Sequence, residues 1–302
     1  MAAPERIRVA SAQYHPERLA NLAALEAKLA RWVEDAAQGG ADLIVFPEYA
    51  GMEIAGTCTD AIAADLAHSL DAVAQLRPTI DAHLGRLAAN HRIHILGPSG
   101  PARRADGSVA NCALLHTPDG GCGRQEKMIM TPFERKWGIT GGRAAQVFDT
   151  RIGRVGILIC YDSEFPLLAR AMSEAGARLL LVPACTERLS GFNRVRTAAL
   201  ARALENTVAI VLSPTVGDAL WSPAIDRNTG SAGVYVAAEA GISDTGVLAE
   251  GPLNDARLIF GDIDFGQLER LRTSGEMRNT TDWALQPGAA AGRTVAGLVD
   301  LR

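Results

Sequence analysis

Short apolar runs of strand length recur along the chain and alternate with segments of helical periodicity. The clearest runs span 43–46, 154–160, 179–182 and 208–212. Continuous apolar runs of this length are typical of strands that are buried on both faces. Because strands and helices interleave without an internal repeat, the sequence predicts a layered α/β architecture.

Local patterns predict the remaining elements. Apolar residues recur at helical spacing from Leu22 to Leu29, and Gly39-Gly40 provides a stop. A second helical region is expected over 61–90, with a break near Pro78, because proline supplies no backbone N–H to a helix. Further strands are expected at 7–13, 94–96, 111–117, 123–127, 147–148, 233–237 and 256–263, turns at 118–121 and 151–153, and helices at 165–175 and 194–205.

Composition describes a chain that can bury a sizeable core. Of the 302 residues, 48% are hydrophobic and 21% are charged, which argues against disorder. No Ser/Pro-rich linker divides the chain, so we expect one domain over 1–302, with an extended Gly/Ala-rich tail from about residue 286. The formal net charge of -4 gives no basic field, and a nucleic-acid partner is therefore not expected.

The N-terminus and the cysteines indicate a compartment. MAAPERIRVA lacks the charged-then-apolar pattern of a signal peptide, and the longest apolar runs are strand-sized. We therefore expect a cytoplasmic protein without a membrane partner. An odd number of cysteines leaves at least one free thiol, which fits a reducing compartment; they lie at positions 58, 112, 122, 160 and 185 and form no CxxC pair.

Neither a cofactor nor a metal ion is expected. No glycine-rich phosphate loop or dinucleotide fingerprint follows a strand. His91 and His94 are spaced HxxH, but in a segment that turns into a strand they face opposite sides, and no third ligand is nearby.

Three reactive side chains follow strand-like runs that are far apart in sequence. Glu48 follows LIVFP, Lys127 follows GRQE and Cys160 follows VGILI. Strand ends of a layered α/β protein meet at one edge of the sheet, so an acid, an amine and a thiol can share one pocket. These are the parts of a thiol acyl-transfer site.

The segments around these residues form an ordered set that resembles the nitrilase superfamily, the carbon-nitrogen hydrolases. The matching segments are ADLIVFPE, TPFER, GILICYDSEFP and ARALENTVAIV, and they cover the chain from about Arg8 to Asp264. The resemblance implies a four-layer αββα sandwich with a catalytic Glu48–Lys127–Cys160 triad. It also implies a homodimer or a larger even-numbered homo-oligomer, since in relatives such a tail often wraps a neighbouring subunit.

The chemistry of the three side chains suits this assignment. A thiol with a pKa near ~8.5 needs a base or a cation to become a nucleophile. Desolvation raises the pKa of Glu48 towards a range useful for proton transfer, and an ammonium at Lys127 favours the thiolate and stabilises an oxyanion, together with the Tyr161 N–H. The alternatives are a buried structural Cys160, an ordinary salt bridge at Glu48 and a solvated Lys127.

Supporting residues follow from the same resemblance. Glu134 in TPFER matches a second glutamate that bonds the lysine and helps to position substrate, although Glu126 and Glu164 lie close in sequence. Cys185 and Thr186, at another strand end, are expected to line the substrate, with core packing as the alternative for Cys185. One departure concerns the FPE that continues many nucleophile motifs, which here reads FPL and ends at Leu167.

The function predicted from the sequence is hydrolysis of a non-peptide C–N bond, with a small linear carboxamide as the substrate and a thioester on Cys160. A nitrilase or an N-carbamoyl amidohydrolase would use the same triad. An acyltransferase or a non-enzymatic scaffold are less favoured alternatives, because no membrane segment is present and the triad is intact. The substrate itself is not identified by the sequence.

Overall fold

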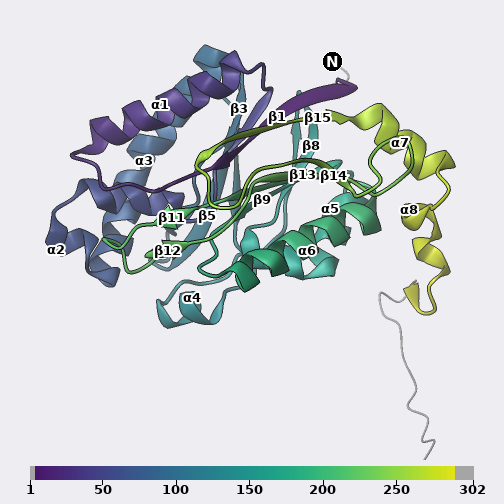
Figure 1. The fold of residues 1–302 in the computed structure, drawn as a ribbon. Coiled ribbons are helices and arrows are strands. Elements are labelled where there is room, and N and C mark those ends of the chain that lie inside the picture. The colour runs from purple at the N-terminus through teal and green to yellow at the C-terminus, as the bar shows by residue number, and fades with distance from the viewer. Residues whose placement is uncertain (1–3, 290–302) are drawn as a thin grey trace, which may run out of the picture.

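Two β-sheets packed face to face form the centre of the computed structural model, which describes residues 4–289 (Figure 1). Neighbouring strands of the first sheet are, in spatial order, β15 (Arg257–Asp264), β1 (Arg6–Gln13), β2 (Leu43–Val45), β3 (His94–Leu96), β5 (Val109–His116) and β4 (Gly100–Arg103), with β6 (Cys122–Glu126) also paired to β5. The second sheet has the order β14 (Val247–Glu250), β13 (Gly233–Tyr235), β10 (Ala209–Pro214), β9 (Leu179–Ala184), β8 (Gly153–Ile157) and β7 (Val147–Thr150).

Helices cover the outer face of each sheet. Residues of α1 (Leu22–Gln38) and α3 (Leu66–His91) share one apolar cluster with the outward side chains of β1, β2 and β3. Residues of α5 (Pro166–Glu174) and α6 (Leu189–Asn206) pack on the second sheet, and the two helix pairs lie on opposite sides in Figure 1. The four-layer αββα sandwich predicted from the resemblance is confirmed.

Shorter elements connect these layers or extend them. They are η1 (Ala50–Thr57), α2 (Asp60–Ala63), α4 (Pro132–Lys136), η2 (Cys160–Glu164), β11 (Gly217–Asp218), β12 (Arg227–Asn228), α7 (Phe265–Ser274), α8 (Asn279–Asp282) and η3 (Trp283–Leu285).

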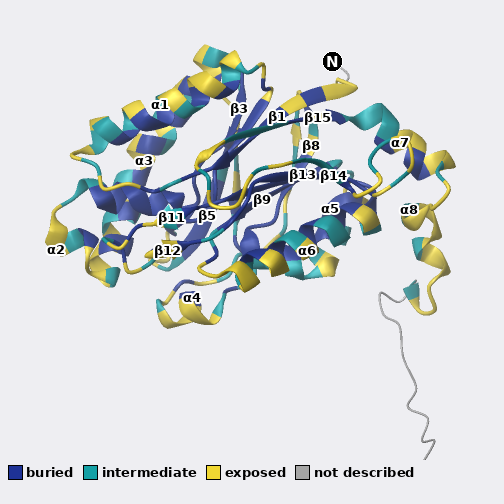
Figure 2. Ribbon diagram, in the orientation of Figure 1, coloured by how far each residue is buried: buried dark blue, intermediate teal, exposed yellow. Residues whose placement is uncertain are grey.

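The space between the sheets is buried and largely apolar (Figure 2). Alternate residues of β1 divide between the layers: Val9 faces the second sheet, whereas Ala10 faces α1 and α3. Two serines also join the sheets, because the Ser11 hydroxyl donates to the Leu212 carbonyl at 2.6 Å and Ser213 Oγ lies 2.8 Å from the Ala12 carbonyl. Burial of a hydroxyl costs little folding free energy when the hydroxyl has a hydrogen-bond partner, and these two bonds fix how the sheets face each other.

Several predicted boundaries are wrong in an instructive way. α3 continues through Pro78, and the expected break lies earlier, at the Asp65 cap between α2 and α3. Buried Val73 and Ile80 flank the proline and pack in the outer core, which offsets the hydrogen bond that proline cannot make. Helix α6 begins five residues before the predicted 194, at Leu189.

Several short elements were not predicted from the sequence, and most of the predicted C-terminal tail is not among the described residues. The strands β4, β11, β12 and β14 and the helices α7 and α8 have only two to ten residues each, too short for a clear periodic pattern. Most of the tail predicted from about residue 286 lies outside the described residues. Among residues 4–289, no helix is both long enough and apolar enough to cross a membrane.

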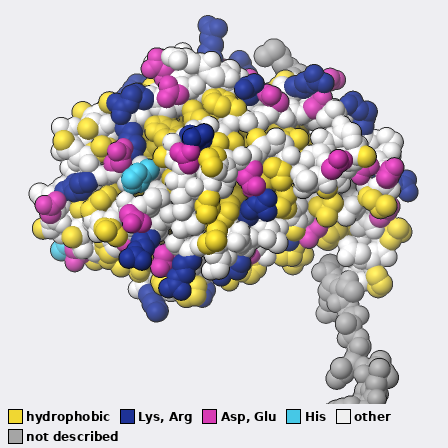
Figure 3. All heavy atoms as spheres, in the orientation of Figure 1, with side chains coloured by type: hydrophobic (Ala, Val, Ile, Leu, Met, Phe, Trp, Pro, Cys, Tyr) yellow, Lys and Arg dark blue, Asp and Glu magenta, His cyan; other side chains and the backbone are white. Residues whose placement is uncertain are grey.

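The visible surface carries both signs of charge. In the face shown in Figure 3, Lys and Arg side chains are interspersed with Asp and Glu side chains. This mixed distribution agrees with the small net charge of -4.

Candidate active site

Glu48, Lys127 and Cys160 meet where the two sheets end. Glu48 lies three residues beyond β2, Lys127 directly follows β6, and Cys160 opens the 3₁₀ turn η2 after β8. The first two come from one sheet and the third comes from the other. Their exposed fractions are only 1%, 1% and 5%.

The Lys127 ammonium lies between two carboxylates. Its Nζ atom is 2.7 Å from Glu48 Oε1 and 2.7 Å from Glu134 Oε2. The structure therefore places Glu134 beside the lysine, as the resemblance implied. The two competing glutamates pair elsewhere: Glu126 bonds Arg104, and Glu164 contacts Arg194.

Glu134 is fixed by the start of a short helix. Thr131 caps α4, and its side chain and that of Glu134 bond each other's backbone N–H in a capping box. Glu134 Oε2 also accepts from the Thr131 hydroxyl, and Oε1 accepts from the Tyr49 hydroxyl at 2.9 Å and from Asn111 Nδ2 at 3.2 Å. Asn111 Nδ2 also donates to Glu48 Oε1 at 3.0 Å, so one amide links both carboxylates.

Cys160 has a left-handed backbone, with φ of 49°. The predicted strand over 154–160 is confirmed only as far as Ile157, where β8 ends, and Cys160 with its positive φ begins the turn η2. Cys160 Sγ lies 3.9 Å from the Cys185 carbonyl oxygen, and the Cys185 N–H donates to Glu48 Oε2 at 3.0 Å. The backbone of Cys185 thus contacts both the thiol and the carboxylate.

Burial and charge push the two carboxylates apart in pKa. Burial raises the pKa of Glu48, and Lys127 only partly opposes that shift. For Glu134 burial acts in the same direction, but Lys127, Thr131 and Tyr49 outweigh it and hold its pKa below the usual value. Glu48 is therefore the better proton acceptor of the pair.

The lysine stays charged and the thiol stays protonated at rest. Burial disfavours the ammonium, yet Glu48 and Glu134 together raise the pKa of Lys127. Burial and the Glu48 carboxylate raise the pKa of Cys160 well above its usual value, and Lys127 opposes them without overcoming them. A nucleophilic role for this thiol would require its proton to leave, and Glu48 lies beside it.

Asp162 ties the cysteine turn to the segment after the lysine. Its carboxylate accepts the N–H groups of Met128, Ile129 and Ile159 at 2.8–3.2 Å. Burial raises the pKa of Asp162 to about 7, against the backbone bonds from Met128 and Ile129. This side chain therefore holds η2 and the Lys127 segment at a fixed separation.

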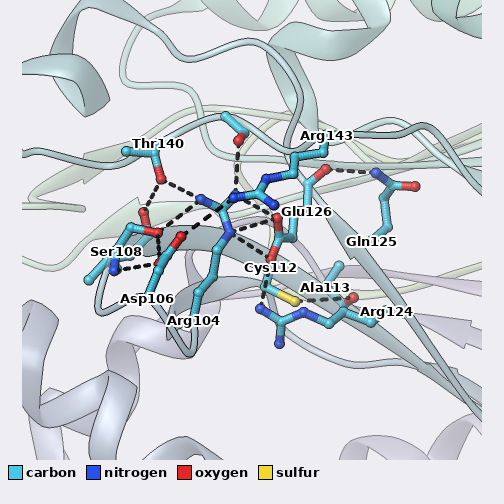
Figure 4. Close-up of polar contacts among 12 residues, drawn as sticks. Arg104, Asp106, Ser108, Cys112, Ala113, Arg124, Gln125, Glu126, Thr140 and Arg143 are labelled. Atoms are coloured by element: carbon cyan, nitrogen blue, oxygen red, sulfur yellow. Dashed lines mark hydrogen bonds and ion pairs between the residues drawn. The ribbon is translucent and has the colours of Figure 1, made fainter.

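A charged network supports the same segment from outside (Figure 4). Arg104 bonds the Glu126 carboxylate at 2.5–3.1 Å and the Gly141 carbonyl at 2.9 Å. The next residue, Gly142, donates its N–H to the Lys127 carbonyl at 2.7 Å. Strand β6 and the 140–142 loop are thus joined immediately behind Lys127.

The remaining predicted site residues lie near the same strand ends. Tyr161 follows Cys160 in η2, and its ring packs edge-on against Phe165 at 4.9 Å. The Cys185 thiol contacts Asn228 Oδ1 at 3.3 Å, and the Thr186 hydroxyl donates to the Thr229 carbonyl at 2.7 Å. These side chains contact the last residue of β12 and the residue that follows it, and substrate contact by either stays a prediction.

Sequence reasoning missed three residues that complete the polar cluster. Tyr49 and Asp162 were adjacent to recognised motifs, in FPEY and CYD, and their position beside Glu48 and Cys160 was the available signal. Asn111 had no local signal, since it lies inside β5 and reaches both carboxylates only through sheet pairing.

Comparison with known proteins gives a consistent result. A family model described as carbon-nitrogen hydrolase matches residues 8–273. The probable hydrolase YhcX of Bacillus subtilis is 31% identical over 280 residues, which are 91% of this chain and 53% of that protein. The chain thus spans about half the length of this relative.

Two further relatives cover more of their own length. An (R)-stereoselective amidase of Pseudomonas sp. is 29% identical over 252 residues, 81% of this chain and 85% of that protein. A crystal structure of a carbon-nitrogen hydrolase from Helicobacter pylori G27 superposes with a TM-score of 0.74 at 21% identity, covering 89% of this chain and 92% of the other. At that identity the superposition shows a shared fold.

Proposed function

Because the chain belongs to the carbon-nitrogen hydrolase family, we propose that it hydrolyses a non-peptide C–N bond, that of a small linear carboxamide, through a thioester on Cys160. The observation that carries the proposal is the buried Lys127 ammonium held 2.7 Å from each of two carboxylates, beside the Cys160 thiol. An ion pair with only a structural role would not require a thiol beside it, so the position of Cys160 favours a catalytic role.

The reaction follows from the proton positions. Cys160 Sγ attacks the carbonyl carbon while its proton passes to Glu48, and the new oxyanion is stabilised by Lys127 and the Tyr161 N–H. Glu48 then gives the proton to the departing nitrogen and the C–N bond breaks. Ammonia or an amine is released, and the acyl group stays on Cys160 as a thioester. Glu48 next takes a proton from water, which attacks the thioester, and the returned proton regenerates the thiol as the acid is released.

A nitrile or an N-carbamoyl group presents the same kind of electrophilic carbon bound to nitrogen. Attack by Cys160 would then give a thioimidate or a carbamoyl thioester on the same atom, with the same demands on Glu48 and Lys127. These activities are the alternatives to amide hydrolysis. Ammonia release from a panel of linear amides, nitriles and N-carbamoyl compounds distinguishes them.

Mass spectrometry of the intact protein tests the covalent step. With an active amide, the wild type should gain the mass of the acyl group, and Cys160→Ala should gain none. Cys112→Ala is the matched control, since that thiol is also buried but lies in β5 on other contacts, and it should keep the adduct. Glu48→Gln should lower turnover by about a hundredfold or more. An acyl adduct on Cys160→Ala would refute the mechanism.

Assembly and location belong to the same proposal. We propose that residues 1–302 act as one domain in a cytoplasmic homodimer or larger even-numbered homo-oligomer, on the family resemblance. Sedimentation of the full chain and of a chain ending at Trp283 tests the assembly and the part played by the tail. A monomer in both cases would contradict it.

A further inference from the structure

The two carboxylates beside Lys127 differ in how many hydrogen bonds they accept. Glu48 accepts from Lys127 Nζ, Asn111 Nδ2 and the Cys185 N–H. Glu134 accepts from Lys127 and Asn111 as well, and in addition from the Thr131 N–H, the Thr131 hydroxyl and the Tyr49 hydroxyl. Each donor stabilises the ionised form, so the ionised state is more strongly favoured at Glu134.

Tyr49 reaches Glu134 from an unusual backbone conformation. It directly follows Glu48 and has φ of 54°, in the left-handed region that a bulky side chain rarely adopts. Its N–H bonds Ser99 Oγ at 3.3 Å, and its ring meets Trp137 edge-on at 5.9 Å. Ser99 and Trp137 therefore hold Tyr49 in this strained conformation. Its backbone directly follows Glu48, while its hydroxyl bonds Glu134.

We propose that Tyr49 is a positioning residue that keeps Glu134 ionised, so that Glu48 alone of the two carboxylates takes up the proton in each cycle. This inference rests on the proposed function and adds a determinant that neither the triad nor the second glutamate contains. If Glu134 shared the proton, Lys127 would lose one counter-charge and Glu48 would remain a carboxylate for part of each cycle. The base and the oxyanion-stabilising cation would then both be altered.

The charged and titratable groups around Glu134 belong to the same polar cluster. Lys127 and Tyr49 contact it directly, Glu48 lies across the ammonium, and Cys160 and Cys185 adjoin Glu48 and Lys127. Removal of the Tyr49 hydroxyl withdraws a donor from the ionised carboxylate and so raises the pKa of Glu134 towards that of Glu48. The two groups would then titrate as a coupled pair.

A purely structural role for the Tyr49 hydroxyl can be tested against a second buried tyrosine in the same chain, Tyr14. Buried tyrosine hydroxyls usually find a partner, whatever their role. Tyr14 donates to Glu53, a buried glutamate that also pairs with Lys28, so this second tyrosine–glutamate–lysine cluster repeats the chemistry away from Cys160. Tyr14→Phe and Tyr49→Phe therefore remove the same kind of bond in two places.

The experiment compares pH profiles of the two variants with an amide that the wild type turns over. Tyr49→Phe should lower kcat by about tenfold and move the acid limb of kcat/KM up by a few tenths of a pH unit, since a second carboxyl then titrates close to Glu48. Tyr14→Phe should leave kcat and the acid limb unchanged, even if it lowers the melting temperature.

A second measurement does not depend on turnover. Carbon-13 NMR of carboxyl-labelled glutamate, with Glu134→Gln and Glu48→Gln used for assignment, should show Glu134 titrating at higher pH in Tyr49→Phe than in wild type. If no adduct forms on Cys160 but the Glu134 titration moves as expected, the proposed function would be rejected while the effect of Tyr49 on the ionisation of Glu134 would stand. Should Tyr49→Phe fail to fold, Thr131→Val removes another donor and should raise the same titration. An unmoved acid limb and an unmoved Glu134 titration, or equal shifts in Tyr14→Phe, would overturn the role of Tyr49.

Discussion

Lys127 shows how a single buried cation organises its neighbours. With Glu48 and Glu134 both ionised, the cluster carries one more negative than positive charge, in a place with 1% exposure at each partner. Such a cluster persists only because every charge has several hydrogen bonds. The surplus negative charge has a use, since it raises the proton affinity of the less strongly bonded carboxylate, Glu48.

Replacement of Lys127 by methionine should separate catalysis from stability. Lys127→Met leaves two buried carboxylates without their cation, so kcat should fall by about a hundredfold or more and stability by about 3–5 kcal/mol. Without the ammonium the folded-state pKa values of Glu48 and Glu134 rise, and stability carried by a raised carboxyl pKa is present at low pH and lost as the pH rises. The deficit in urea unfolding should therefore be smaller at about pH 5 than at about pH 7.5.

Lys28→Met is the control for this variant. Lys28 is buried against Glu53 at 2.6 Å, so its loss should also destabilise the fold. Turnover of the folded protein should nevertheless stay within about threefold of wild type. Equal loss of turnover in both variants would mean that Lys127 acts through stability alone.

At the scale of elements, short connecting segments decide where the reactive groups lie. The turn η2 and the helix α4 each have five residues, too few to be stable alone. Asp162 accepts the N–H groups of Met128 and Ile129 in the Lys127 segment and that of Ile159 in its own turn, and the Thr131 cap begins α4 beside Lys127. The placement of both short elements is therefore set by side chains that bond backbone N–H groups.

Arg104 gives a test at this scale. Arg104→Ala removes its bonds to Glu126, Thr140 and Gly141 and should cost about 1–3 kcal/mol, because the side chains of Arg104 and Glu126 are only 15% and 18% exposed. Hydrogen exchange at Gly142, whose N–H bonds the Lys127 carbonyl, should become faster. Arg143→Ala is the control, since that side chain is 84% exposed and 3.5 Å from Asp106, and it should change stability by less than about 0.5 kcal/mol. A larger effect from Arg143 would contradict the network drawn in Figure 4.

At the scale of the whole molecule, the close packing of the two sheets creates the site. Glu48 and Lys127 follow strands of the first sheet, whereas Cys160 and Cys185 follow strands of the second, so the bond from the Cys185 N–H to Glu48 exists only when the sheets meet. Contacts between the sheets are therefore as important to the site as the reactive residues.

Alanine substitutions at two glycines test how closely the two sheets pack. A Cβ at Gly261 in β15 would lie 2.7 Å from Val234 Cγ2 on the facing sheet, so Gly261→Ala should cost about 1–3 kcal/mol through overpacking. A Cβ at Gly85 in α3 would have its nearest neighbour at 3.6 Å, and Gly85→Ala should stabilise the helix by about 0.5–1 kcal/mol. Urea unfolding of both variants checks the pair, and a neutral Gly261→Ala would show that the sheets can move apart without cost.

Much of this protein could be predicted from sequence because the relevant signals are local. Apolar runs located β1, β2, β3, β9 and β10 within two residues at either end, since buried strands have few other compositions. The motifs FPE, CYD and TPFER located Glu48, Cys160 and Glu134, because each side chain is placed by the strand or cap beside it. Errors arose where tertiary packing overrides local preference, as at Pro78.

The sequence by itself determined the layered fold and the reactive residue types, whereas the tertiary structure alone decided which carboxylate is the stronger base. That difference follows from the bonds that Tyr49 and Thr131 make to Glu134 and not to Glu48, and their distances are set when the chain folds. A pKa depends on burial and on the number of nearby donors, and both come into being only when the chain has folded.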